Sequence, residues 1–146
     1  MTDTPPSKDY TARDRDFMRA CRRVIAESSD PDLTIAKVSA RAAAMRAPSY
    51  YVEYSYAMRK LNALAARRTR LDGKTTCARW TEIQSRVAAL MDHRGLTRNE
   101  ALARVLREGG ASSFFLAPRS AARLYLRLRH AGRAGGRPER QNAANR

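Results

Sequence analysis

Two stretches of the chain combine paired aromatic residues with arginines, a combination suited to contacts with a polyanion. The first, residues 47–61, holds four of the six tyrosines, and the second is residues 111–125. Aligned without gaps, four of their fifteen positions are identical and three more conserve residue type. Aromatic rings can stack on bases, and guanidinium groups can neutralise phosphates. We therefore interpret the chain as two copies of one small helical unit that binds nucleic acid.

Each aromatic pair can be interpreted in two ways, as core packing or as contact with nucleic acid. Rings at Tyr50, Tyr54 and Phe114 are expected in the core, because their neighbours are mostly Ala and a ring buries a large apolar area. Adjacent residues on a helix point about 100° apart, so one ring of each pair can face outward. For Tyr51, packing and contact with a base or phosphate remain open. Phe115 lacks a hydroxyl for a phosphate hydrogen bond, which leaves open whether the second copy binds or only packs.

Basic residues follow each aromatic pair along the chain. Residues 59–79 hold seven basic side chains against one acid, residues 119–146 hold eight against one, and the formal net charge is +15. Soluble helices usually alternate charge signs, so an anionic partner is preferred over a merely solvated surface. Nucleic acid is the expected partner of such a basic chain. We expect base contacts from Arg46 and Ser49, and phosphate contacts from Tyr51, Arg59, Lys60, Arg67, Arg68, Arg119, Arg123 and Arg127.

The sequence contains little that would indicate an active site, a metal site or a membrane segment. The two histidines, His93 and His130, each fall near a predicted helix end, and the 14 acidic residues form no paired-carboxylate pattern. A glycine-rich phosphate loop, a metal-ligand cluster and a nucleophile elbow are all missing from the sequence. No apolar run approaches the length of about 18 residues that a membrane span needs. We expect no enzyme, no cofactor, no metal and no membrane partner.

Cysteine usage indicates the compartment. Cys21 and Cys77 are far apart and in no metal spacing, which fits a reducing cytoplasm better than a disulfide scaffold. Cys21 falls on the apolar stripe of its predicted helix and is expected in the core, whereas Cys77 is expected near the surface. The first nine residues show no signal-peptide pattern. We expect a cytoplasmic protein.

Apolar periodicity and capping residues predict the helices. The first unit should contain a helix over residues 10–28, a second helix capped near Thr34, a short helix capped by Ser49, and a basic helix capped by Ser55. In the second unit, Thr97-Arg98-Asn99-Glu100 matches a capping box. Gly95 should end the helix before this box, and Pro118 should occupy the first turn of a last helix that ends near His130.

The predicted architecture is all-α, with two tandem helix-turn-helix-like units and disordered ends. An arm over residues 1–9 precedes the first unit, residues 10–70. A linker over residues 71–77 leads to the second unit, residues 78–131, and a basic tail over residues 132–146 closes the chain. Two units in one chain could take the place of a dimer of half-site readers.

The first unit resembles the DNA-binding domain of TetR-type repressors over residues 14–64. The likeness rests on Leu33-Thr34-Ile35-Ala36 and on the segment from Ser49 to Tyr54. It implies that Thr34 opens the motif, that Ser49 and Tyr51 lie on the recognition helix with Tyr51 at a phosphate, and that Tyr54 is core. The family's turn glycine and serine are replaced by Ala44 and Arg46.

The whole chain also resembles small, basic, uncharacterised bacterial proteins that carry a repeated Pro-Ala-Pro-x-Phe-Tyr-type motif. The matching segments are Ala47 to Tyr51 and Ala111 to Leu116, and the resemblance implies two units without implying a function. We expect a non-enzymatic protein that binds duplex DNA rather than RNA, in a regulatory or architectural role. The alternatives are an RNA- or ribosome-associated protein, a structural component of a phage or mobile element, and an adaptor for an acidic protein.

Overall fold

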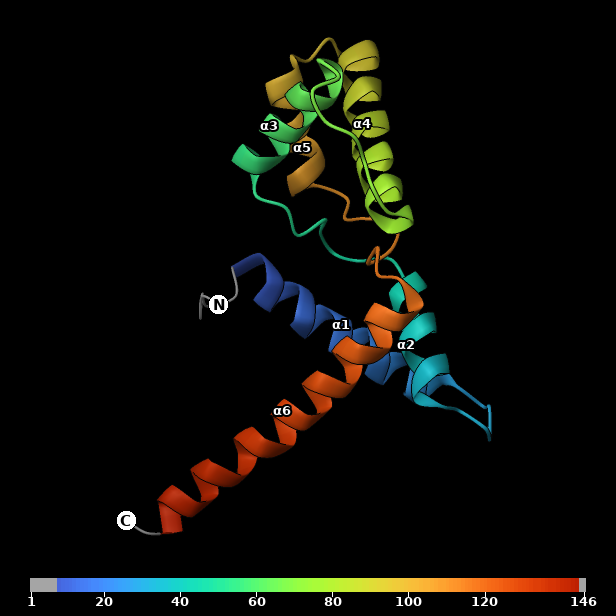
Figure 1. The fold of residues 1–146 in the computed structure, drawn as a ribbon, viewed down its shortest axis with the longest axis vertical. Helices are drawn as coiled ribbons and strands as arrows, with labels where there is room; N and C mark the ends of the chain where they lie inside the picture. The colour runs from blue at the N-terminus through green and yellow to red at the C-terminus, as the bar shows by residue number, and fades with distance from the viewer. Residues whose placement is uncertain (1–7, 145–146) are drawn as a thin grey trace.

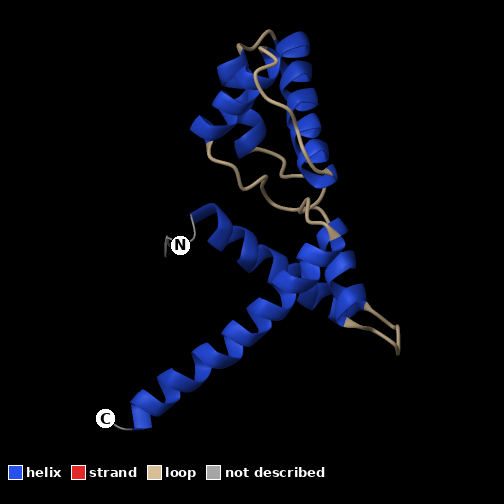
Figure 2. Ribbon diagram, viewed as in Figure 1, coloured by secondary structure: helices blue, strands red, loops and turns tan. Residues whose placement is uncertain are grey.

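The computed structural model describes the backbone of residues 8–144 and the side chains of residues 11–132. Within these residues the fold is all-α, as predicted, and it contains no strand (Figure 2). An isolated antiparallel bridge joins Ala47 to Ala111. The helices are α1 (Lys8–Glu27), α2 (Ile35–Ala44), α3 (Tyr54–Ala65), α4 (Lys74–Arg94), α5 (Arg98–Arg107) and α6 (Pro118–Ala144).

The helices form two lobes that do not follow the order of the chain. In lobe 1, α6 packs on α1 and α2, and in lobe 2, α3 packs beside α4 and α5 (Figure 1). Each repeat thus gives its third helix to the other repeat, so the tandem units predicted over residues 10–70 and 78–131 are not the spatial units. The reason is the extended segment before each third helix. Residues 45–53 can span roughly 30 Å when extended, which carries α3 from lobe 1 to lobe 2.

The two extended segments cross between the lobes and pair there. Ala47 N–H donates to Ala111 O at 3.0 Å, and Ala111 N–H donates to Ala47 O at 2.8 Å. Both alanines are buried, and they occupy equivalent positions of the two repeats. A pair of hydrogen bonds exchanged by equivalent residues is the pattern expected at an approximate two-fold axis. We call residues 45–53 and 108–117 the crossing segments.

The short helix predicted from Ser49 to Tyr54 is not formed, and with it the recognition helix is missing. Residues 48–53 are not helical, and α3 begins at Tyr54 with Glu53, not Ser55, as its N-cap residue. Ser49 Oγ instead accepts from Tyr51 N–H at 2.9 Å, a local bond that competes with helix formation. Tyr51 has a φ of 58°, and the equivalent Phe115 has a φ of 52°. A left-handed residue in each segment prevents a helix from continuing through the aromatic pair.

Most predicted helix ends are confirmed. Thr34 Oγ1 caps α2 by accepting from Lys37 N–H, and both bonds of the capping box at Thr97 are present. Gly95 closes α4 in the left-handed conformation, and Pro118 is the first residue of α6. Two boundaries differ from the prediction by more than two residues.

The first difference is that α4 starts at Lys74, inside the predicted linker. The second is that α6 continues to Ala144, past the end expected near His130. Of the arm and tail predicted to be disordered, residues 1–7 and 145–146 lie outside the described residues, and the side chains of residues 133–144 are not described.

A single cluster of buried residues runs through both lobes and the crossing. Phe17, Trp80 and Ile83 are its largest fully buried members, and Cys21 is fully buried as expected. Trp80 stands at the position equivalent to Phe17, so each lobe has one of these two rings in its core. Lobe 1 adds Val38, Ala42, Ala121, Leu124 and Tyr125, lobe 2 adds Ala57, Leu61, Val87, Leu102 and Val105, and the crossing adds Ala47, Tyr50, Ala111 and Phe114.

Candidate nucleic-acid interface

The four aromatic residues of the repeated motif stack on one another at the crossing. The ring of Tyr50 stacks on Phe115 with centroids 6.3 Å apart, and that of Tyr51 stacks on Phe114 at 6.2 Å. Phe114 also meets Phe17 edge-to-face at 5.5 Å. Each ring therefore pairs with a ring of the other repeat, an arrangement worth about 0.5–1.5 kcal/mol per pair beyond area burial. This packing holds the two crossing segments together.

Tyr51 is engaged by the protein at both its ring and its hydroxyl. The hydroxyl donates to Oδ2 of Asp16, a residue of α1, at 2.8 Å. Burial raises the pKa of Tyr51, and the hydrogen bond to Asp16 raises that pKa further. A phosphate contact by Tyr51 would have to replace the Asp16 bond. Tyr54, which was expected in the core, is 38% exposed instead. It is the first residue of α3 and lies on the same side of that helix as Ala57 and Leu61, but one turn before the buried part of that side begins.

A polar network that the sequence did not reveal ties α4 to the crossing. The Tyr50 hydroxyl donates to Glu82 Oε2 at 2.5 Å and accepts from Arg86 Nη1 at 2.8 Å. Ser112 N–H also donates to Glu82 Oε2, and Arg86 Nη1 donates to Gly110 O at 2.6 Å. In sequence, Glu82 and Arg86 resemble an ordinary i,i+4 surface pair on a helix. Their actual partners lie some 30 residues away along the chain.

The network shifts the pKa values of Tyr50 and Glu82. Burial and the hydrogen bond to Glu82 raise the pKa of Tyr50 to about 12. Burial alone would raise the pKa of Glu82, but hydrogen bonds from Ser112 and Tyr50 outweigh it and lower that pKa. At neutral pH, a protonated tyrosine therefore donates to a carboxylate, which is the form that the observed hydrogen bonds require.

Arg46 and Ser49, expected to face bases, both lie in the first crossing segment. The Arg46 side chain is exposed, and its Nη2 donates to Gly109 O at 3.4 Å. Ser49 is half-buried and bonded to Tyr51 N–H. Neither residue lies on a helix, so neither is positioned in the way that a recognition helix positions a base-reading side chain in the major groove.

In lobe 2, the predicted phosphate contacts lie on α3 and on the loop after it. Arg59 points away from the buried residues Ala57 and Leu61, and Lys60 is half-buried. Arg67 and Arg68 are exposed at the end of α3, where their backbone N–H groups bond to Leu64 O and Ala63 O. Among the described residues, no carboxylate lies within ion-pair distance of these four cations.

In lobe 1, the predicted phosphate contacts form a row along α6. Arg119, Arg123 and Arg127 step by four residues, which places them about 6 Å apart along one side of the helix. All three are exposed, opposite the buried face formed by Ala121, Leu124 and Tyr125. Arg127 lies 3.8 Å from Asp14, a distance at the outer limit of an ion pair. Arg123 also occupies the position equivalent to Arg59 of lobe 2.

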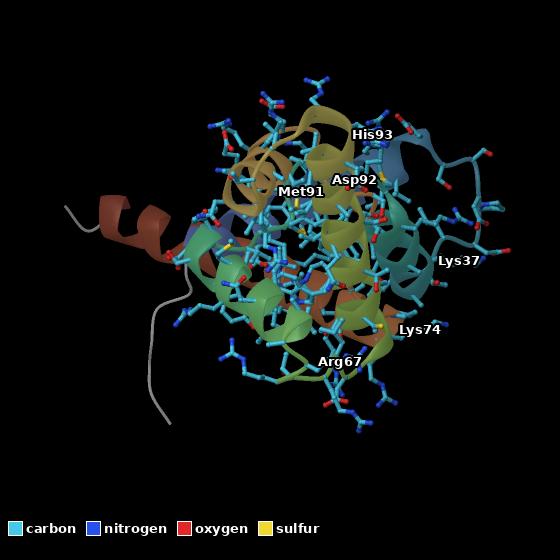
Figure 3. The ribbon with its side chains drawn as sticks, turned by 90° about the horizontal axis from the view of Figure 1, so that it is seen from above. Lys37, Arg67, Lys74, Met91, Asp92 and His93 are labelled. Carbon is cyan, nitrogen blue, oxygen red and sulfur yellow. The ribbon has the colours of Figure 1, made fainter. Side chains whose placement is uncertain are left out.

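The loop after α3 connects the basic residues of lobe 2 with the junction of the lobes. Lys74, the first residue of α4, and Pro118, the first of α6, line the same cavity of about 510 Å³. The loop that carries Arg67 runs down along α4 to Lys74 (Figure 1), and both residues lie on the same side of the molecule in Figure 3. We call Arg67, Arg68, Arg70, Lys74, Arg119, Arg123 and Arg127 the basic track.

In the described part of the chain, the His, Cys, Asp and Glu residues form no group of three or more that could hold a metal ion. None of its helices is both long enough and apolar enough to span a membrane.

Comparisons with known proteins add no relative from which a role could be inferred. No family model matches the chain, and neither a curated protein nor a solved structure matches it.

Proposed function

We propose that the protein is a non-enzymatic nucleic-acid-binding protein that grips the phosphates of duplex DNA, in a regulatory or architectural role. The observation that carries this proposal is the basic track. Its residues come from two distant parts of the sequence and are exposed, and only Arg127 has a carboxylate partner among the described residues. These seven positive charges repel one another and favour a polyanion that screens them.

Phosphate contact is favoured over base stacking by the state of the aromatic residues. The four motif rings are packed on one another, and the Tyr51 hydroxyl is bonded to Asp16. We do not propose base reading by a helix at residues 48–54, because residues 48–53 are not helical. Contacts to phosphates alone carry no direct sequence information, so we expect weak sequence preference.

Duplex DNA is favoured over RNA by the approximate two-fold relation of the repeats. Arg59 and Arg123 occupy equivalent positions on equivalent helices, one in each lobe. A pseudo-symmetric protein can present such helices to two symmetry-related parts of a duplex. A preference for folded RNA would instead support the ribosome- or RNA-associated alternative.

The proposal is tested by measuring affinity for a random 30-base-pair duplex and for a structured RNA across a salt series. The variant Arg67→Ala/Arg68→Ala should weaken duplex binding and reduce the slope of log K against log salt by about 2, or roughly 0.9 per lost phosphate contact. The charge-matched control is Arg19→Ala/Arg22→Ala on the exposed side of α1. Equal slopes for the two variants, or no binding of either nucleic acid at low salt, would refute the proposal.

A further inference from the structure

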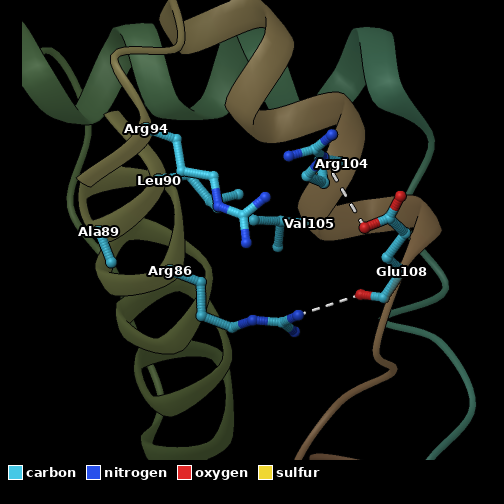
Figure 4. Close-up of a pocket in the computed structure, with 7 residues that line it drawn as sticks. All are labelled: Arg86, Ala89, Leu90, Arg94, Arg104, Val105 and Glu108. Atoms are coloured by element: carbon cyan, nitrogen blue, oxygen red, sulfur yellow. Dashed lines mark hydrogen bonds and ion pairs between the residues drawn. The ribbon is translucent and has the colours of Figure 1, made fainter. Parts of the chain in front are cut away.

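A second cavity, separate from the basic track, lies between α4 and α5. Its volume is about 390 Å³, within the range of small-molecule sites. The apolar part of the lining is formed by Ala89, Leu90 and Val105. Three arginines and one carboxylate complete the lining, namely Arg86, Arg94, Arg104 and Glu108 (Figure 4).

The charges around this cavity are not balanced. Arg86 is held by neutral acceptors, since its Nη2 donates to Glu108 O at 3.0 Å and its Nη1 to Gly110 O. Arg104 Nε lies 3.7 Å from Glu108 Oε2, which is a loose ion pair. Arg94 extends from α4 across the cavity (Figure 4), and no carboxylate of the described residues pairs with it. Arg86 also lies close enough to Glu82 to lower the pKa of that carboxyl. Within the cavity lining, Arg94 and Arg104 therefore share the single carboxylate of Glu108.

The equivalent place in lobe 1 contains its own anion. There, Asp30 Oδ2 accepts from Lys37 Nζ at 3.2 Å and from Arg41 Nη2 at 3.4 Å. The two repeats align at an offset of 63 in this region, where Leu33-Thr34 matches Leu96-Thr97. Arg104 then corresponds to Arg41, and His93 replaces Asp30. At the same offset Glu100 replaces Lys37, and Arg104 contributes to lowering the pKa of Glu100. Arg94 replaces Pro31, so lobe 2 has gained an arginine that can take an anion from outside.

From this imbalance we infer that the α4–α5 cavity binds the phosphate group of a phosphate ester. Arg94 and Arg104 would clamp the phosphate, and Arg86 would stay fixed in its structural bonds. The organic part of the ester would lie on Ala89, Leu90 and Val105. Guanidinium forks match the geometry of phosphate oxygens, and bonds between charged partners are about twice as strong as neutral ones. This inference does not rest on the proposed function, because the cavity is separate from the basic track.

The test is a titration of the full chain with adenosine 5′-monophosphate, adenosine and inorganic phosphate, followed by calorimetry and by the ¹⁵N signals of the arginine side chains. The monophosphate should bind and shift the Arg94 and Arg104 signals, inorganic phosphate should bind more weakly, and adenosine should not bind. The variant Arg94→Gln/Arg104→Gln should weaken monophosphate binding at least about ten-fold, as expected for the loss of charged hydrogen bonds. Arg19→Gln/Arg22→Gln should leave binding within about two-fold of the wild type.

Equal binding by the two variants would overturn the inference, as would equal binding of adenosine and its monophosphate. Competition with duplex DNA identifies the source of the phosphate. Displacement of the duplex by the monophosphate, together with weaker duplex binding by Arg94→Gln/Arg104→Gln, would assign the cavity to a phosphate of the polynucleotide. Unchanged duplex binding would assign it to a free ester. Monophosphate binding without any duplex binding would support the cavity and refute only the proposed function.

Discussion

Replacing Gly110 by Ala should break the crossing that joins the two lobes. Gly110 has a φ of +62°, and a Cβ built there would collide with Ala47 O and lie 3.3 Å from Pro48 O. These are backbone atoms, which cannot move aside as a flexible side chain can. The collision would separate Ala47 from Ala111 and break the two hydrogen bonds between them. Gly95→Ala is the matched control, because Gly95 has a φ of +64° and nothing lies within 4 Å of its built Cβ.

The control should lose about 1 kcal/mol, since a left-handed alanine costs roughly 1–2 kcal/mol and the stiffer unfolded chain returns part of it. Gly110→Ala should lose this amount and a further 1–3 kcal/mol or so for each buried group left unsatisfied, at least about 3 kcal/mol in total. For a chain of this size that predicts Tm decreases of about 3 °C and about 10 °C respectively. Circular dichroism during thermal and denaturant unfolding measures both. Equal losses in the two variants would show that the crossing segments do not meet as described.

Three further predictions concern stability and reactivity. Thr97→Ala should destabilise the protein by about 1 kcal/mol, and by more than Thr34→Ala, because only Thr97 belongs to a reciprocal capping box; equal losses in denaturant unfolding would count against this. A thiol reagent should modify one cysteine of the folded chain quickly, since Cys77 is exposed, whereas Cys21 is buried and its pKa is raised to about 11; two fast thiols before denaturation would contradict the burial. Finally, the raised pKa of Tyr50, about 12 against an ordinary 10, means that folding favours the neutral phenol, so its contribution to stability is complete below pH 10 and is lost as the pH rises toward 12. Tyr50→Phe should flatten this alkaline loss in unfolding measured from pH 8 to pH 11.5 or so, and an unchanged pH profile would refute the assignment.

Those parts of the fold that depend on neighbouring residues were predictable from the sequence. The capping box at Thr97, the left-handed Gly95 and the first-turn Pro118 act within one helical turn, and each lies where it was expected. The core positions Tyr50 and Phe114 were also predicted, because an aromatic ring surrounded by small residues has few other places to pack. These local signals predict where helices begin and end, but not which helices pack together.

The exchange of the third helices could not be predicted, because it depends on contacts between residues that are distant in the sequence, such as Ala47 and Ala111. Tyr51 adopts a conformation that only glycine adopts readily, and its stacking on Phe114 and its bond to Asp16 stabilise that conformation. From the local sequence alone, a helix was predicted for the same residues. In the candidate interface, the sequence predicted that most arginines are exposed, because the chain has too many of them to bury. The cavity between α4 and α5 could not be predicted, because helix periodicity does not show which arginines lack a carboxylate partner.

The most direct test of the account is whether the two ends of the basic track contact the same duplex. The salt slope of duplex binding should be measured for Arg67→Ala/Arg68→Ala, for Arg119→Ala/Arg123→Ala and for the quadruple variant. Each pair should reduce the slope by about 2, and the quadruple variant by nearly 4, because all four side chains neutralise phosphates of one DNA molecule. If either pair leaves the slope at the wild-type value while the protein stays folded, the two basic segments do not form one phosphate-binding surface, and the central claim fails.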